Sequence, residues 1–404
     1  MTGLSAARHK VTTWTLRKDF SYDRPHPTLE PPKWNINGLS PVPHVEGTCY
    51  AKTFPMFLQK AGYRTIHVGK AHWGAQDTPG ADPKALGFDV NVAGHYAGGI
   101  GSHYAKKNFS SPGEPIWDPP GLEEYYGKDL YLTEVLTIEA NKQIDKAVAD
   151  KKPFYLYMSH YATHAPFEVD DRFSKKYEDA GLTGVDLAYA TMIEGIDKSL
   201  GDILANIKRQ GIEDNTIVMF MTDNGAPPAV PRNLPLKGHK LHSYEGGPRV
   251  PMIVKWPGVT KPHSVCEDYM ICEDIFPTFL EMAGVKDYDQ IGLQIDGISF
   301  VPLLKGKKAR HKDRSLFWHF PHNYVVEPFS STRKGDWKLI YFRTDEHFEL
   351  YNLKNDIGET NNLMDKHKDI AKSLAHELRA FLIETHADMP TIKTTSTPVP
   401  LPKF

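Results

Sequence analysis

Three short segments of the sequence hold residues that suit the binding of a cation and an oxyanion. Asp223 and Asn224 offer hard oxygen ligands of the kind that Ca²⁺ and Mg²⁺ prefer. Two adjacent ligands cannot complete a shell of about 6–8 oxygens, so further ligands would have to come from elsewhere. Lys70 and Lys240 carry ammonium groups that can hold a tetrahedral oxyanion. Each feature also has a structural interpretation, because Asp-Asn-Gly is a common turn signal and a lysine after glycine is often solvated.

Two histidines extend this set of polar residues. His72 and His164 are able to hold an oxyanion, or to protonate a leaving oxygen. His164, which precedes Ala-Pro, can also be interpreted as a hydrogen-bonded loop histidine. A divalent cation combined with Lys and His describes the hydrolysis of a phosphate or sulfate ester. This prediction depends on the convergence of the residues, not on any one of them.

These polar residues follow predicted strands, and convergence requires those strands to share one sheet. In open α/β sheets, ligands bind beyond the carboxyl ends of the strands. The run at 216–221 is continuously apolar, which is typical of a strand buried on both faces of a parallel sheet. Apolar patterning predicts strands over 63–68, 154–158, 216–221 and 251–254, and helices over about 54–61, 129–149, 186–210 and 271–284.

The alternation of strand and helix predicts an α/β fold with a doubly wound, mostly parallel sheet. We assign residues 1–305 to this domain and residues 306–404 to a smaller C-terminal α+β subdomain with a small antiparallel sheet and a terminal helix. A cluster of Lys and Arg over 305–314 is interpreted as a solvated linker between them. The tail from Pro390 is expected to be disordered or draped over the surface.

The composition of the chain argues against some classes of function. The chain has 404 residues, with 48 Lys and Arg against 50 Asp and Glu, which gives a net charge of −2. We therefore expect no nucleic-acid partner, because such binders show a basic excess. No apolar run approaches the roughly 18–20 residues of a transmembrane helix. No apolar stretch follows Met1, so no secretory signal is visible.

Short motifs occur in order along nearly the whole chain, and together they resemble the sulfatase family, an arylsulfatase-like group within the alkaline phosphatase superfamily. One such motif is a weak signal, whereas this many in the same order are specific. The motifs are AGYRT at 61–65, GKAHWG at 69–74, THAPF at 163–167, TDNG at 222–225, EGGPRVP at 245–251 and LYNL at 350–353.

The resemblance implies a cation and a sulfate at one site. Asp223 and Asn224 are then two ligands of a divalent cation, which is Ca²⁺ in most of the family, with Mg²⁺ as the alternative. Lys70 and Lys240 bind the sulfate oxygens. The implied partner is a sulfated small molecule or glycan.

The resemblance also implies roles for histidines. His164 contacts the sulfate and assists departure of the leaving group, and His72 supports the nucleophile. The C-terminal unit helps to shape the substrate pocket. His319 and His322 are therefore substrate-binding candidates, although an aromatic-rich strand edge is the simpler interpretation of that segment.

The chain contains no match to the family's nucleophile, a formylglycine made from Cys or Ser in a C/S-x-P-x-R motif. Cys49 is followed by Tyr50-Ala51-Lys52 and does not fit. The first strand of the family, which supplies two acidic cation ligands, has no match either. Thr2-Gly3 resembles the segment after the nucleophile motif, so both missing parts are expected upstream of Met1. We expect the chain alone to be inactive.

Three functions remain open at this point. The first is a sulfuric ester hydrolase, for which the long loops at 74–128 favour a carbohydrate sulfate over a small aryl ester. The second is a non-catalytic homologue that binds sulfated glycans. The third is a phosphoesterase of the same superfamily, although the sequence shows no D-x-x-x-H pair for the two Zn²⁺ ions of such enzymes. The resemblance suggests a periplasmic or secreted protein, and oligomeric state is not predicted.

Overall fold

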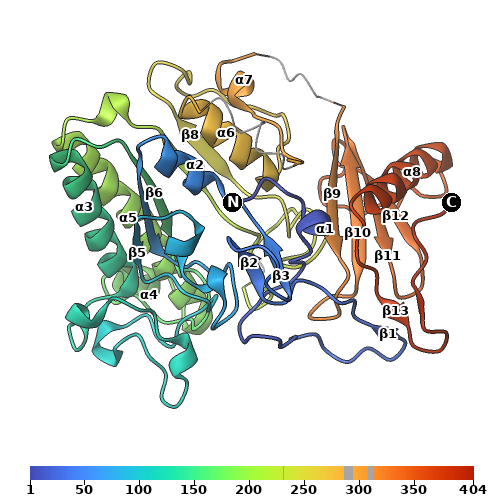
Figure 1. Ribbon diagram of the computed structural model, residues 1–404, viewed down its shortest axis with the longest axis horizontal. Coiled ribbons are helices and arrows are strands. Elements are labelled where there is room, and N and C mark those ends of the chain that lie inside the picture. The colour runs from blue at the N-terminus through green and yellow to red at the C-terminus, as the bar shows by residue number, and fades with distance from the viewer. Residues whose placement is uncertain (231, 286–293, 308–312) are drawn as a thin grey trace.

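A three-stranded parallel sheet lies at the centre of the larger part of the molecule (Figure 1). The computed structural model describes residues 1–404 except 231, 286–293 and 308–312. Strand β4 (Arg64–Gly69) lies between β5 (Val90–Val92) and β6 (Phe154–Ser159) and is parallel to both. Ile66 and Val68 of β4 are completely buried. The carboxyl ends of these strands therefore meet at one edge of the sheet, as predicted.

Helices pack on both faces of this sheet, which confirms the α/β fold class (Figure 1). On one face, Leu136 joins Leu156 of β6 in the main apolar core. On the other face, Phe54 packs against Tyr155 of β6. Tyr155 and Leu156 are adjacent in a strand, so their side chains point to opposite faces. The first face is covered by α3 (Leu132–Ala149) and α5 (Gly184–Arg209), and the second by α2 (Phe54–Lys60) and α6 (Ile275–Met282).

The apolar run at 216–221 forms a strand, but the prediction that this strand is buried on both faces of a parallel sheet was wrong. Strand β7 (Val218–Met221) pairs antiparallel with β8 (Met252–Lys255), and all four β7 residues are partly exposed. Within the described residues, β6 and β7 each pair along one edge only. A strand is buried on both faces only where other elements cover both faces of its sheet, and the faces of β7 are only partly covered. Its apolar sequence is therefore half exposed instead of buried.

The C-terminal part of the chain forms an antiparallel sheet with a long helix, as expected for a small α+β unit. Ile340 and Phe329 face the α/β part, where they pack with Tyr244. The opposite face packs against α8 (Lys368–Glu384) through Leu339. The boundary between 305 and 306 stays a prediction. The sheet has the order β12 (Phe348–Asn352), β11 (Trp337–Phe342), β10 (Phe329–Lys334), β9 (Ser315–Phe320).

Two segments expected to be solvated or disordered are bound to the rest of the molecule. Arg314, from the basic run, forms an ion pair with the buried Asp274, while Lys308, Arg310 and Lys312 lie outside the described residues. The tail pairs in a small sheet with residues near the N-terminus, so it is ordered. The remaining elements are α1 (Ala6–His9), β1 (Leu29–Glu30), β2 (Gly38–Ser40), β3 (Thr48–Tyr50), α4 (Ser174–Asp179), α7 (Val301–Leu304), β13 (Thr391–Ile392) and β14 (Thr397–Pro398).

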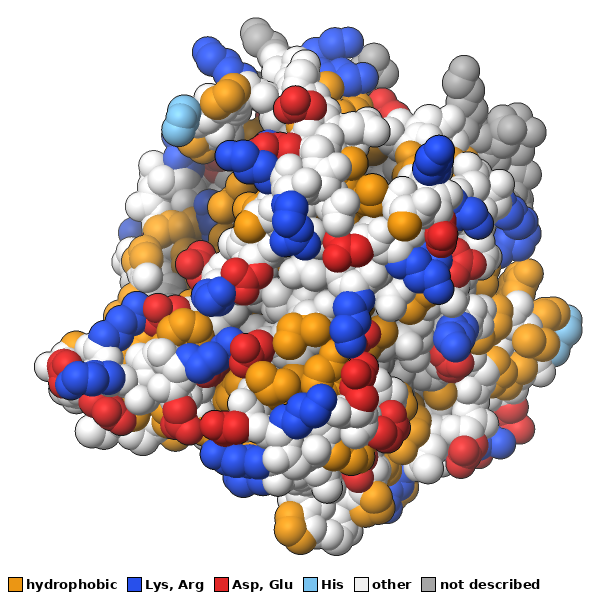
Figure 2. Space-filling view, turned by 90° about the vertical axis from the view of Figure 1, so that its left-hand side faces the viewer, with side chains coloured by type: hydrophobic (Ala, Val, Ile, Leu, Met, Phe, Trp, Pro, Cys, Tyr) orange, Lys and Arg blue, Asp and Glu red, His pale blue; other side chains and the backbone are white. Residues whose placement is uncertain are grey.

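The surface carries both signs of charge. Figure 2 shows basic and acidic side chains interspersed over the face that includes α3 and α5. Ion pairs such as Lys198–Asp202 along α5 contribute to this pattern. The helices within the described residues include none with the length and apolar character needed to cross a bilayer.

Candidate active site

A glycine at the end of β4 positions Lys70. Gly69 has a φ of +105°, and a Cβ there would lie 1.8 Å from the carbonyl oxygen of Ser159. Only glycine permits this approach, which allows the Lys70 amide to donate to the Ser159 carbonyl at 2.7 Å. His67 Nε2 donates to the Lys70 carbonyl at 3.1 Å. Lys70 is therefore fixed at the carboxyl ends of β4 and β6.

His72 is held on three sides. Its amide donates to the carbonyl of His95 at 3.0 Å, and its Nε2 donates to the carbonyl of Thr15 at 2.5 Å. A Cβ on Gly98 would lie 2.2 Å from His72 Nδ1, so the backbone of that glycine packs directly against the ring. The orientation of the His72 ring is thus set by one loop before β4, which contains Thr15, and one loop after β5, which contains His95 and Gly98.

His164 lies on the loop after β6. Its amide donates to the Tyr161 carbonyl at 2.9 Å, and His103 Nε2 donates to the His164 carbonyl at 3.2 Å. The Nδ1 of His164 donates to the carbonyl of Ala165 at 3.0 Å. In the neutral ring this leaves Nε2 as the acceptor.

The segment after β7 and the loop that carries Lys240 are bonded to each other. Asp223 Oδ1 accepts from the amide of Asn224 at 2.9 Å, in the bend that follows β7. The Gly225 amide donates to the Gly247 carbonyl at 2.9 Å, and the Lys240 amide donates to the Ala226 carbonyl at 3.0 Å. The lysine and the two oxygen-bearing side chains therefore come from a single hydrogen-bonded loop pair.

The electrostatic interactions show that these loops meet. Burial lowers the pKa of Lys70, the nearby Lys240 lowers it further, and Asp223 opposes both effects. Burial lowers the pKa of His72 to about 4, with Lys70, His164 and Lys240 all acting in the same direction. The structure thus brings together the residues predicted from four separate segments. Their roles stay predictions.

The charge state of His164 follows from the same neighbours. Burial lowers its pKa, and the two lysines lower it further, against the opposing effects of the Ala165 carbonyl and Asp223. His164 and His72 are therefore neutral at pH 7. Without a bound anion, the site contains two cationic side chains, two neutral imidazoles and one nearby carboxylate.

The oxygen ligands for a cation remain incomplete. Asp223 and Asn224 are chemically suited to Ca²⁺ or Mg²⁺. The described residues form no group of three or more His, Cys, Asp or Glu side chains that would hold a metal ion. The Asn224 amide nitrogen donates to the Gly225 carbonyl at 3.0 Å, which leaves its oxygen as the only donor to a cation. These two residues alone do not fit a full cation shell.

The prediction that His319 and His322 bind substrate was wrong. His322 is completely buried, with Nε2 2.6 Å from Thr12 Oγ1 and Nδ1 3.0 Å from Asp23. His319 is 5% exposed and contacts Ser330 Oγ at 2.7 Å and the Asp388 carbonyl at 3.0 Å. Both nitrogens of each ring are engaged inside the protein, so neither ring is available to a ligand.

Sequence reasoning missed two positioning residues, His67 and His103. Each is completely buried and holds the backbone carbonyl of a site residue, Lys70 or His164. His67 had a weak signal, because it is a polar residue inside an otherwise apolar strand. His103 lies in a loop of glycine and tyrosine where no pattern distinguished it.

Comparison with known proteins places the chain in one family. The family profile described as Sulfatase matches residues 3–285, which is more than half of the chain. The chain belongs to the sulfatase family. A second profile, described as N-sulphoglucosamine sulphohydrolase, C-terminal, matches residues 239–386. This match includes the whole C-terminal antiparallel sheet.

Individual sulfatases are similar over much of the chain. A sulfatase of Formosa agariphila is 33% identical over 352 residues, which cover 80% of this chain and 62% of that protein. The N-acetylgalactosamine-6-sulfatase of Mus musculus is 33% identical over 66% of this chain and 50% of its own length. The chain therefore spans less than two thirds of either relative.

A solved structure matches over a larger share. The crystal structure of Ps i-CgsB in complex with k-i-k-neocarrahexaose has a TM-score of 0.72 and 26% sequence identity. The match covers 87% of this chain and 79% of that one.

Proposed function

We propose that this chain carries the sulfate-binding half of a carbohydrate sulfatase site, and that the protein hydrolyses a sulfuric ester of a sugar. The observation that supports this most is the convergence of Lys70 and Lys240 beside His72 and His164, with Asp223 as a nearby counter-charge. Two ammonium groups in a partly dehydrated site attract an oxyanion more strongly than they would in water.

Lys70 and Lys240 hold the sulfate oxygens in this proposal. Their charge is what lowers the pKa of His164 beyond the effect of burial. A bound sulfate offsets that charge, so it raises the pKa of His164 and favours a proton on Nε2. From there the imidazolium would donate its proton to the ester oxygen as the S–O bond breaks and the sulfuryl group passes to a nucleophile, for which these 404 residues hold no precursor motif. His72 stays neutral and orients groups beside the sulfate.

The substrate class is inferred from relatives. One relative is named an N-acetylgalactosamine-6-sulfatase, and one similar structure contains a neocarrahexaose. Both names refer to a sugar, which supports a sulfated glycan as the ligand of this chain. A periplasmic or secreted location is part of the same proposal.

The chain lacks parts that turnover needs. None of the 404 residues lies in a C/S-x-P-x-R motif, so the formylglycine of the family has no precursor here. Asp223 and Asn224 are the two side chains that would bind Ca²⁺, or alternatively Mg²⁺, and a bound cation would polarise the sulfate oxygens. Because the described residues do not complete its shell, no step is assigned to it. We expect this chain to bind sulfate esters without hydrolysing them.

Calorimetry with the purified chain tests the proposal. A sulfated carrageenan oligosaccharide should release heat on binding, and Lys240→Ala should weaken its affinity by about tenfold or more, because one charge-assisted contact is lost. Lys175→Ala serves as a control, since Lys175 pairs with Asp179 on exposed α4. Absence of binding, or equal affinity of Lys240→Ala and the wild type, contradicts the sulfate site. Preference for the matching phosphate ester would favour the phosphoesterase instead.

A further inference from the structure

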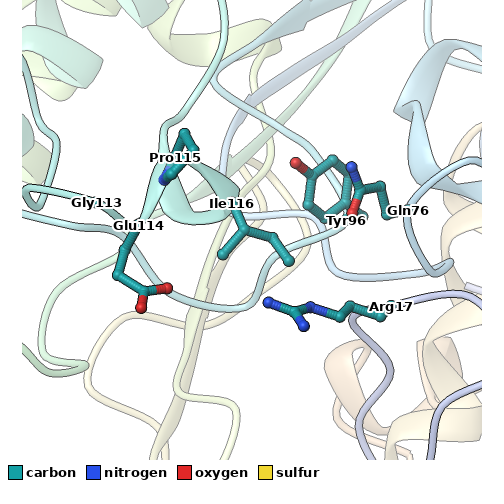
Figure 3. A pocket seen from close by; sticks show the side chains of 7 residues that line it. All are labelled: Arg17, Gln76, Tyr96, Gly113, Glu114, Pro115 and Ile116. Carbon is teal, nitrogen blue, oxygen red and sulfur yellow. The ribbon is translucent and has the colours of Figure 1, made fainter.

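A cavity of about 370 Å³ opens beside the candidate active site (Figure 3). Its walls include Arg17, Gln76 and Tyr96 on one side and Glu114 and Ile116 on the other. Ligand pockets in proteins usually measure about 300–1,000 Å³, so this one has room for a sugar residue but not for a long chain. None of these side chains has a role in the sulfate site described above.

The side chains of the first wall lie next to backbone segments that hydrogen-bond to His72. Arg17 lies two residues after Thr15, whose carbonyl accepts the Nε2–H of His72. Tyr96 directly follows the residue whose carbonyl accepts the His72 amide. The Gln76 amide donates at 2.8 Å to the carbonyl of the residue before Arg17. The three polar side chains of this wall are therefore attached to the backbone segments that fix the His72 ring.

The second wall is attached near His164. Glu114 and Ile116 are followed by Trp117, whose ring lies against Gly99. A Cβ on Gly99 would lie 3.7 Å from the Trp117 ring and 3.7 Å from His164 Nδ1. The wall thus ends next to the histidine proposed to protonate the leaving group.

The guanidinium group of Arg17 lines the cavity opposite Glu114 and is not paired with it. Among the described residues, it forms no ion pair and no side-chain hydrogen bond. Figure 3 shows its side chain reaching into the cavity beside Ile116 and below the Tyr96 ring. A planar guanidinium binds a sulfate or carboxylate through two parallel hydrogen bonds. The Tyr96 ring offers an apolar face to a sugar ring, and Gln76 and Glu114 offer partners for hydroxyl groups.

We propose that this cavity is a second sugar subsite, in which Arg17 binds the anionic group of the sugar residue next to the one that carries the scissile sulfate. This inference rests on the proposed function, because it takes Lys70 and Lys240 as the first subsite. It makes the preferred ligand an oligosaccharide with charges on two neighbouring sugars. Arg17 then determines specificity and takes no part in the chemical step.

Two ligands and two variants of the full chain test the subsite by calorimetry. One ligand is a carrageenan-type disaccharide with a single sulfate, and the other is the same disaccharide with a second sulfate on the neighbouring sugar. Arg17→Ala should weaken binding of the disulfated ligand by about tenfold, the effect of one bidentate charged contact, and leave the monosulfated ligand unchanged. Arg17→Lys keeps the charge without the planar fork and should restore part of the loss. Arg209→Ala on α5 is the control.

The outcomes separate the subsite from the sulfate site. An equal loss for both ligands, or no loss for either, overturns the role of Arg17, while a loss on Lys240→Ala in the same series leaves the proposed function intact. If the wild-type chain binds neither ligand, the proposed function fails and the subsite fails with it. Because Arg17 lies at the surface, unchanged thermal melting of Arg17→Ala will show that any loss is not caused by misfolding.

Discussion

The active-site edge of the parallel sheet and the junction with the C-terminal sheet both gather charged side chains, but in opposite ways. At the junction, the ammonium of the completely buried Lys338 lies 3.0 Å from Glu245 Oε1 and 3.1 Å from Glu359 Oε1. At the sheet edge, neither Lys70 nor Lys240 forms an ion pair in the described part of the chain. Charge in direct ion pairs holds the two parts of the molecule together, whereas the two lysines, which have Asp223 only as a nearby counter-charge, are available to a ligand.

The histidines repeat this contrast. His322 has both ring nitrogens engaged by Thr12 and Asp23 inside the protein. His164 uses one nitrogen on the neighbouring Ala165 carbonyl and keeps the other as an acceptor. A histidine next to aromatic residues is thus a poor indicator of a ligand site unless its second nitrogen is unoccupied.

The largest expected effect is at the junction. Lys338→Met leaves the buried Glu359 without its cation, while Glu245 keeps Arg249 at 3.2 Å and Arg333 at 3.7 Å. Removing one partner of a buried ion pair typically costs about 3–5 kcal/mol. We expect the free energy of unfolding in urea to fall by that amount. Adding Glu359→Gln to Lys338→Met should recover part of the loss, since it removes the carboxylate that has lost its cation. A loss below about 1 kcal/mol would contradict the structural role of this cluster.

Acid should lower the free energy of unfolding through His67 and His103, the two buried histidines that position site residues. Burial lowers the pKa values of His67 and His103 to about 4, below their usual 6.5. Between these values the unfolded chain binds more protons than the folded one, so stability falls as the pH decreases from 6.5 toward 4. Each histidine contributes up to about 3 kcal/mol of this loss. Thermal melts at pH 7.5, 6 and 5 measure it, and His103→Gln should reduce the slope. A flat profile would contradict the neutral buried state.

A lysine-to-methionine substitution at the sheet edge should change the free energy of unfolding in the opposite direction from Lys338→Met. Lys70→Met removes an ammonium that burial disfavours, so the free energy of unfolding should rise by about 1 kcal/mol. Binding of the sulfated oligosaccharide should be lost in the same variant. Urea unfolding of Lys70→Met and Lys338→Met side by side gives the sharpest form of the comparison. Destabilisation by both would mean that the two lysines are equally structural.

The smallest expected effect concerns the cation. Asp223 and Asn224 alone should bind Ca²⁺ with a Kd of about 1 mM or weaker, so 1 mM Ca²⁺ adds at most about 0.4 kcal/mol to the free energy of unfolding. Differential scanning calorimetry with Ca²⁺, with Mg²⁺ and with chelator measures this. A shift of several degrees that disappears in Asp223→Asn would show that the chain completes the shell with other oxygens.

Local patterns in the sequence predicted the elements well. The helices at α3 and α5 and the strands β4 and β6 begin and end within a few residues of the expected positions. The convergence of Lys70, His72 and His164 was also predictable, because they follow β4 and β6, neighbouring parallel strands whose carboxyl ends share one edge. The position of Lys240 did not follow from this argument, because it lies between β7 and β8, which pair antiparallel in a separate sheet.

Contacts between distant segments were not predictable. The apolar pattern of β7 indicated a strand but not its neighbours, which are set by the rest of the sheet. His322 is buried because Thr12 and Asp23 come from the other end of the sequence. Arg314 was assigned to a solvated run, yet Asp274 binds it from a helix-capping turn. In each case the decisive partner is remote, and no local period encodes it.

The unpaired edges of β6 and β7 have a consequence for handling the protein. Apolar strands with free backbone amides and carbonyls are templates for pairing with another chain. Tyr157 of β6 is 36% exposed, so an apolar side chain lies beside the edge of that strand. Self-association should therefore grow with protein concentration, and light scattering will reveal it before any loss of folded structure. The sheet that concentrates the ligand-binding residues also limits the colloidal stability of the chain.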